Sequence, residues 1–148
     1  MNIYEQLILS LKSVHEAMVD LMKPSENEGI SHGQLFLLFT IHKKGSIKTT
    51  QISNYFGITP GAATAIADKL EKLGLIERER DKNDRRIVII KLSDAGIKYV
   101  NNKRSKNLER IEYVLQDFTE AELLSTIESL QKLTETINSS KEFIPEKD

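Results

Sequence analysis

Apolar residues recur every three or four positions over the first 21 residues, the spacing that gathers them on one side of an α-helix. The residues of this stripe are Ile3, Leu7, Leu11, Val14, Met18 and Leu21. Pro24 and the polar residues after it predict the end of the helix. A second helix is predicted to begin at Ser31, since Gln34 three residues later completes a capping box, and to end at Gly45.

Two short helices joined by a glycine turn are predicted next. The first covers residues 51–56, with Thr49 or Thr50 as its cap. The second begins where Thr59 is followed by Pro60, because a capping threonine with proline in the first helical position is a strong start signal. This arrangement predicts a helix-turn-helix.

A β-hairpin is predicted directly after the second of these helices, which ends at Gly74. Residues 75–80 and 87–92 are rich in residues typical of strands, and the polar residues 81–86 form the turn between them. A hairpin in this position is a wing. The sequence therefore predicts a winged helix-turn-helix.

Two further helices are predicted towards the C-terminus. Ser93 begins a long one that runs to about residue 116, and Thr119 with Glu122 forms a capping box for the last. The fold class expected is mainly α with a small β-hairpin wing. Its expected parts are an N-terminal helix and linker (1–30), the winged helix-turn-helix lobe (31–96), and a connecting helix followed by the C-terminal helix (97–148).

The first and last helices each carry an apolar stripe that a small central lobe cannot cover. Pairing with the same stripes of a second chain would bury them, so we expect a homodimer; an intrachain helical bundle is the alternative. The expected interface residues are Ile3, Leu7, Leu11, Val14, Leu123, Ile127, Leu130 and Ile137.

Charge is unevenly divided along the chain, although its net charge is -1. Between Lys43 and Lys106 there are 15 Lys or Arg and 7 Asp or Glu, whereas the remainder holds 6 basic and 15 acidic residues. A basic centre of this kind is typical of a segment that contacts phosphates, although charge alone fits a solvated surface equally well.

The helix predicted from Pro60 has two distinct sides. Its inward side is expected to hold Ala63, Ile66, Ala67, Leu70 and Leu73, and its outward side Gly61, Ala62, Thr64, Ala65, Asp68, Lys69 and Lys72. Small outward residues in the first turn would let the backbone approach a DNA major groove, where Thr64 can bond a base edge and Ala62 and Ala65 can meet a thymine methyl. Since that turn lacks Arg, Asn and Gln, we expect modest direct readout and a larger share of shape readout.

The predicted wing supplies the positive charge that the helix lacks. Lys82, Arg85 and Arg86 can reach a minor groove or its phosphates, and Asp84 can orient the Arg86 guanidinium. On its own, this turn would be interpreted as a solvent-exposed loop without a binding role. Because it follows a helix-turn-helix, it indicates double-stranded DNA as the partner. The DNA-binding residues expected are Thr50, Gln51, Thr59, Gly61, Ala62, Thr64, Ala65, Lys69, Arg78, Lys82, Asp84, Arg85 and Arg86.

Three stretches of the chain together resemble the multiple antibiotic resistance regulator (MarR) family. They are Lys69–Arg78, Asp81–Arg86 and Leu92–Gly96, and upstream Ile30–Leu35 is similar to the start of the family's second helix. The resemblance implies an obligate dimer, held by the first and last helices, that binds pseudo-palindromic operators as a repressor or occasionally an activator. It also implies that Asp84 and Arg86 are the pair that places an arginine in the minor groove.

Regulators of this family often carry a pocket for a small aromatic or apolar effector where the dimer helices meet the DNA-binding lobe. The candidate wall residues here are His15, Met18, Met22, Phe39 and His42, each of which also fits ordinary packing. The three histidines show no tight ligand spacing, so no metal site is expected, and the chain has no Cys for a redox sensor.

Other classes of protein find little support. No phosphate loop, nucleophile elbow or paired-histidine zinc motif is present, so neither an enzyme nor a cofactor is expected. No signal peptide or membrane-spanning stretch is recognised, and the cytoplasm is the expected location. The alternative function is a winged-helix module that docks on proteins, which would not need the basic centre.

Overall fold

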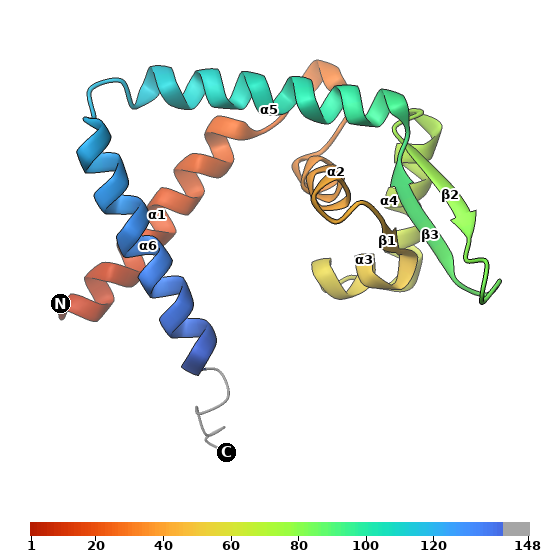
Figure 1. Cartoon of the computed structure of the whole chain (residues 1–148), viewed down its shortest axis with the longest axis horizontal. Helices are drawn as coiled ribbons and strands as arrows, with labels where there is room; N and C mark the ends of the chain where they lie inside the picture. Colours follow the sequence, from red (N-terminus) through yellow and green to blue (C-terminus); the bar gives the residue numbers. More distant parts are fainter. Residues whose placement is uncertain (141–148) are drawn as a thin grey trace. The chain divides into compact units, whose positions relative to one another are not determined.

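The structure is a computed structural model that describes residues 1–140 and contains two compact units, Met1–Leu108 and the described residues from Glu109 onward. The first unit contains a lobe of three helices and a small sheet (Figure 1). The lobe elements are α2 (His32–Lys44), β1 (Ile47–Lys48), α3 (Thr49–Phe56), α4 (Pro60–Lys72), β2 (Ile76–Arg80) and β3 (Val88–Leu92). The remaining elements are α1 (Ile3–Met22), a 3₁₀ turn (Glu26–Glu28), α5 (Asp94–Val114) and α6 (Glu120–Ser140).

The expected fold class is confirmed, and most of the helix starts follow the expected caps. The Ser31 hydroxyl accepts a hydrogen bond from the Gln34 amide, while the Gln34 side chain accepts one from the Ser31 amide. Thr59 caps α4 by accepting from the Ala62 amide at 3.2 Å. Such local bonds satisfy amides that have no partner inside the helix.

Three local features differ from the sequence expectation. The N-cap of α3 is Lys48 rather than Thr49 or Thr50, because the Gln51 side chain accepts from the Lys48 amide at 2.7 Å. Residues 47–48 form the short strand β1, which was not expected. Leu73, expected to pack inward, has an exposed fraction of 45%, because α4 ends at residue 72 and the chain turns away at Gly74.

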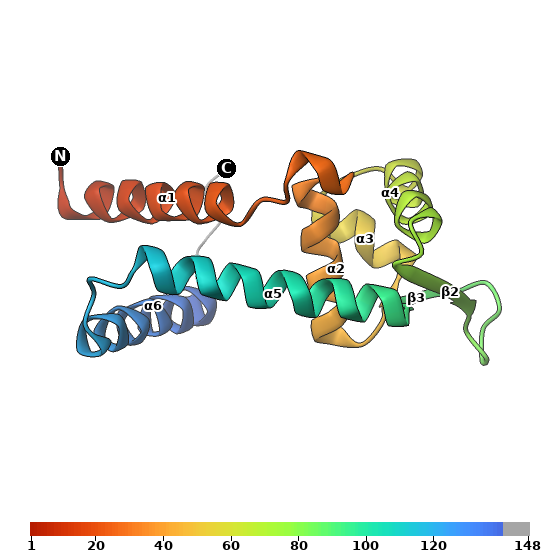
Figure 2. The same ribbon diagram turned by 90° about the horizontal axis from the view of Figure 1, so that it is seen from above.

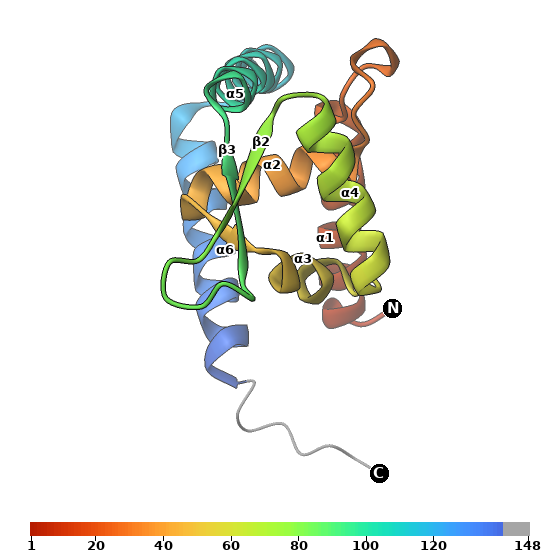
Figure 3. The ribbon, with the colours of Figure 1, turned by 90° about the vertical axis from the view of Figure 1, so that its right-hand side faces the viewer.

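The sheet is antiparallel and has the order β1-β3-β2. Its central strand pairs Ile90 with Ile47 of β1 and with Arg78 of β2. Figure 3 shows β2 and β3 passing beside the three lobe helices, and Figure 2 shows the turn between the strands projecting beyond them. We call the β2–β3 hairpin, residues 76–92, the wing.

The hydrophobic core of the first unit lies within the lobe. Its largest fully buried side chains are Leu37, Leu38, Ile41, Ile47, Ile52, Leu70, Ile90 and Val100. They come from every lobe helix, from two strands and from α5. Because these elements share one apolar core, the position of α4 relative to the wing is set by packing rather than by the turn that joins them.

A buried ion pair ties the segment between α1 and α2 to α5. The Lys103 ammonium lies 2.6 Å from a Glu28 carboxylate oxygen, and the Lys103 side chain is only 8% exposed. Burial is the largest single influence on the Glu28 pKa and raises it, but the hydrogen bonds from Lys103 and from Ser25, together with the Lys103 charge, outweigh burial and lower the Glu28 pKa. Burial, followed by the charge of Glu28, raises the pKa of Tyr99 to about 12.

The two terminal helices leave their apolar residues uncovered within a single chain. Neither α1 nor α6 has a buried residue. Exposed fractions reach 69% at Ile3 and 60% at Val14 on α1, and 48% at Ile127 and 52% at Ile137 on α6. Among the described residues, no helix is long and apolar enough to cross a membrane.

Gly96 provides a test of the contact between α5 and the lobe. A Cβ added there would overlap the carbonyl oxygen of Leu75, which also accepts from the Ser93 amide at 3.1 Å. We expect Gly96→Ala to lower the free energy of unfolding by about 1–3 kcal/mol, as overpacking does, in urea titrations of the purified protein.

Gly33 is the matched control, because it also lies in a helix but a Cβ there meets nothing within 4 Å. Gly33→Ala should leave the stability unchanged or raise it, since alanine is the better helix former. Equal stabilities for the two variants would contradict the close approach at Gly96.

Candidate nucleic-acid interface

The exposed side of α4 begins with a turn of small residues. Its buried side is formed by Ala63, Ala67 and Leu70, whose exposed fractions are all 0%. The seven residues expected to face outward are all exposed: Gly61, Ala62, Thr64, Ala65, Asp68, Lys69 and Lys72. A Cβ on Gly61 would meet nothing within 4 Å, so the fold itself does not require a glycine there. The first turn therefore presents backbone and methyl groups to any partner that approaches.

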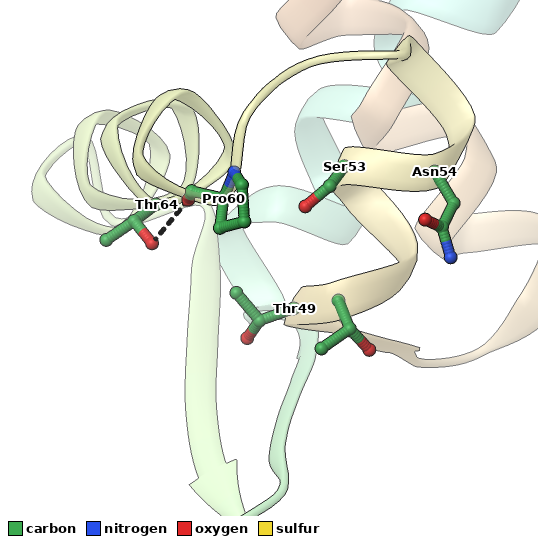
Figure 4. A pocket seen from close by; sticks show the side chains of 6 residues that line it. Thr49, Ser53, Asn54, Pro60 and Thr64 are labelled. Atoms are coloured by element: carbon green, nitrogen blue, oxygen red, sulfur yellow. Dashed lines mark hydrogen bonds between the residues drawn. The ribbon is translucent and has the colours of Figure 1, made fainter.

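An open pocket of about 250 Å³ lies between this turn and α3 (Figure 4). It is lined by Thr49, Thr50, Ser53, Asn54, Pro60 and Thr64. The lining offers hydroxyl and amide groups and no charged side chain, so it can hydrogen-bond a partner without forming an ion pair. Thr50 and Thr64 were expected at the interface, whereas Thr49, Ser53 and Asn54 were missed.

The missed residues carried only a weak signal in the sequence. Ser53 and Asn54 are ordinary polar positions on a short helix, and nothing local shows that they line a pocket together with residues of α4. A search for hydroxyl and amide side chains on both helices of the expected helix-turn-helix would have found them.

Two expected interface residues also serve the fold through their side chains. The Gln51 oxygen accepts from the Lys48 amide, which leaves the Gln51 NH₂ group available to a partner. The Thr59 oxygen accepts from the Ala62 amide, which leaves the Thr59 hydroxyl proton available. Both residues can therefore donate to an anionic group without losing their capping bonds.

The wing turn is held by carboxylates that accept from its own backbone. One oxygen of Asp81 accepts from the amides of Asn83 and Asp84, at 2.7 and 3.1 Å. The Asp81 amide donates to the Ile87 carbonyl at 2.9 Å and closes the hairpin. This network fixes the shape of the turn that carries the basic residues.

Asp84 orients Arg86 as expected. The Arg86 Nε donates to one carboxylate oxygen of Asp84 at 3.1 Å, and an Nη donates to the other at 3.2 Å. The hydrogen bonds from the Arg86 side chain, and then from its amide, lower the Asp84 pKa. The Arg86 side chain remains 91% exposed, so a cation is held in a fixed direction without being buried.

The other basic residues of the wing differ in accessibility. Lys82 and Arg85 are exposed and lie in the turn on either side of Asp84. Arg78, in contrast, is held by α4: an Nη lies 2.5 Å from Asp68, its Nε lies 3.6 Å from Glu71, and its side chain is 25% exposed. Arg78 thus links the wing to α4, and its charge is offset by two carboxylates.

The five candidate effector residues lie on α1 and α2 of the first unit. Phe39 packs against the lobe core, Met18, Met22 and His42 are half-buried, and His15 is exposed. None of the five lines the pocket of Figure 4. No cluster of three or more metal-ligating side chains occurs within residues 1–140.

The link between Arg78 and α4 can be tested by its effect on stability. Arg78→Met should leave Asp68 and Glu71 without their shared cation and lower the free energy of unfolding by about 1 kcal/mol at low salt, a small effect because the ion pairs are partly solvated. Adding Asp68→Asn and Glu71→Gln should recover most of the loss in urea titrations. No recovery would mean that Arg78 acts through packing alone.

Comparison with known proteins places this geometry in a family. The MarR family profile matches residues 30–88, which include α2, α3, α4 and β2. The HTH-type transcriptional repressor MdtR of Bacillus subtilis is 30% identical over 135 residues, which cover 90% of this chain and 86% of that protein.

Solved structures agree with the sequence comparison. The YusO protein of Bacillus subtilis matches with a TM-score of 0.67 and 29% identity, covering 89% of this chain and 94% of that one. FabT of Streptococcus pneumoniae, crystallised in complex with DNA, has the same fold, with a TM-score of 0.73, 22% identity and coverage of 93% and 99%. This chain belongs to the MarR family of transcriptional regulators.

Proposed function

We propose that this DNA-binding transcriptional regulator acts as a repressor and grips a pseudo-palindromic operator as a homodimer. In each half-site α4 enters the major groove and the wing reaches the adjacent minor groove. The observation that carries the proposal is the bidentate Asp84–Arg86 pair, which holds an almost fully exposed guanidinium on the projecting hairpin that follows α4. A guanidinium in this position suits the negative potential of a narrow minor groove.

The charges around α4 support entry into the major groove. Lys69 and Lys72 are exposed on its outer side, where they can meet phosphates. Asp68 and Glu71 lie on the same helix, but both are engaged by Arg78. The carboxylates that would repel the polyanion are thus compensated inside the protein.

The uncovered terminal helices support the homodimer. The expected interface residues on α1 and α6 are exposed or half-buried in the single chain, and a hollow of about 310 Å³ on α6 is lined in part by Ile127 and Leu130. A second copy would cover these side chains with like ones. Twofold symmetry would then place two α4 helices roughly 34 Å apart, one turn of DNA.

Two further parts of the proposal concern the setting in which the regulator works. The named relatives come from bacteria, whose chromosome lies in the cytoplasm, so we place this regulator there as well. We also propose a small aromatic or apolar effector, supported by Met18, Met22 and Phe39, which are only partly buried and leave apolar surface for a ligand.

Binding to duplex DNA at several salt concentrations tests the function directly. Retention in a mobility shift that weakens steeply with salt supports phosphate contacts. Absence of retention even at low salt would favour the alternative, in which the winged helix docks on a protein. Selection from a random duplex library would then define the half-sites and their spacing.

Arg86 provides the first mutational test. Arg86→Ala should weaken binding to the selected duplex by about 1–3 kcal/mol, because the oriented cation is lost, in a fluorescence anisotropy titration. Arg104→Ala is the control, since Arg104 is equally basic and exposed but lies on α5. If both variants bind like the wild type, the wing does not contact DNA.

Leu130 provides the test of the dimer. Leu130→Glu should dissociate or unfold it, since a charge would be buried at the interface without a partner, as measured by light scattering and circular dichroism. Lys132→Glu introduces the same side chain about 200° around α6 and should leave the dimer intact. A folded dimer in the Leu130 variant would remove α6 from the interface.

A further inference from the structure

The hydroxyl of Thr64 has already used its only proton inside the protein. Thr64 Oγ1 donates to the carbonyl oxygen of Pro60 at 3.0 Å, one helical turn earlier (Figure 4). A threonine hydroxyl has one proton and two acceptor lone pairs. The exposed part of this hydroxyl that remains for a partner is therefore an acceptor.

Thr64 is also the only residue of the first outward turn of α4 whose side chain can hydrogen-bond a base. The other outward residues of that turn are Gly61, Ala62 and Ala65, which offer only backbone and methyl groups. Asp68, one turn further along, is engaged by Arg78. Base recognition at this point of α4 thus depends on one oxygen flanked by two exposed methyl groups.

An acceptor selects a different set of bases from a donor. In the major groove only the exocyclic amines of adenine (N6) and cytosine (N4) donate, whereas guanine N7 and O6, adenine N7 and thymine O4 accept. For Thr64 to donate to one of these acceptors, it would have to break its hydrogen bond to the Pro60 carbonyl, so the net gain in binding free energy would be small. The polarity of the hydroxyl therefore excludes most of the base edges that a threonine can otherwise contact.

The flanking methyl groups decide between the two amines. An A·T pair presents the adenine N6 amine and the thymine C5 methyl in the same groove, whereas a G·C pair presents no methyl. Ala62 and Ala65 can pack against that methyl and shield it from water. We propose that Thr64 selects an A·T pair in each half-site by accepting a hydrogen bond from adenine N6, with Ala62 and Ala65 against a thymine methyl.

Thr59, at the start of the same helix, shows the opposite polarity. Its oxygen is occupied by the Ala62 amide, so its proton is available for a phosphate or another acceptor. Thr59 therefore presents a donor to a partner, whereas Thr64 presents an acceptor. This inference rests on the proposed function, and its test separates the two.

The experiment uses the full-length protein and a duplex selected from a random library. Each adenine is replaced in turn by purine, which lacks the N6 amine, and each thymine by uracil, which lacks the methyl. Wild-type protein and Thr64→Val, which keeps the shape of the side chain but has no hydroxyl, are titrated against each duplex.

One adenine in each half-site should stand out in these titrations. There the purine replacement should weaken wild-type binding about tenfold, the scale of one lost hydrogen bond, and should leave Thr64→Val binding unchanged. Because purine also weakens base pairing, only the difference between the two proteins counts. Thr64→Ser, which keeps the hydroxyl, should respond to purine as the wild type does.

Several results would overturn the inference while leaving DNA binding established. One is Thr64→Val binding as tightly as the wild type. Another is a Thr64-dependent loss when a guanine is replaced by 7-deazaguanine, since the hydroxyl would then be donating to N7. A Thr64-dependent contact with cytosine would overturn the A·T assignment. Failure to select any duplex would instead overturn the proposed function itself.

Discussion

The burial of one side of α4 is the constraint on which the rest of the interface depends. Ala63, Ala67 and Leu70 are fully buried against the lobe core, so the helix cannot rotate without exposing them. Small side chains on the buried side also bring the helix axis close to its neighbours. The opposite side, with its turn of glycine, alanine and threonine, is therefore fixed in direction and held out towards a partner.

Electrostatics divides the interface into two parts that work differently. The pocket between α3 and α4 is lined by neutral hydrogen-bonding groups, which suit discrimination by geometry and polarity. The wing carries cations in solvent, where, in the proposed complex, they would add attraction at longer range and make binding sensitive to salt. Arg78 joins the two parts, because it belongs to the wing but forms ion pairs with two carboxylates of α4.

The packing of a single chain leaves the two terminal helices, α1 and α6, uncovered. The hydrophobic core of the lobe buries residues of the lobe elements and of α5, whereas α1 and α6 have no buried residue within the chain. Apolar side chains with exposed fractions near one half form a continuous apolar surface when they follow a helical stripe, and such a surface is typical of an interaction site. In the proposed homodimer a symmetric partner would cover them and, by the same symmetry, double the DNA-binding surface.

The sequence by itself determined the features that depend on short-range bonds. The capping boxes at Ser31 and Thr119, the Thr59 cap on the Ala62 amide and the Asp84–Arg86 pair all join residues two or three positions apart, so local pattern is enough to identify them. The buried and exposed sides of α4 followed from helical periodicity for the same reason, except at Leu73, where the helix had already ended.

Only the tertiary structure decided which distant groups meet. Arg78 reaches Asp68 across ten residues, β1 pairs with a strand some forty residues later, and Ser53 and Asn54 line one pocket with Pro60 and Thr64 of α4. Such contacts depend on how the apolar core orients whole elements, and no local spacing encodes that orientation. The hydrogen bond of Thr64 depends on both kinds of information. Its partner, the Pro60 carbonyl, is local, but the bond matters for a base pair only because the tertiary structure leaves this side of α4 exposed and fixed in direction.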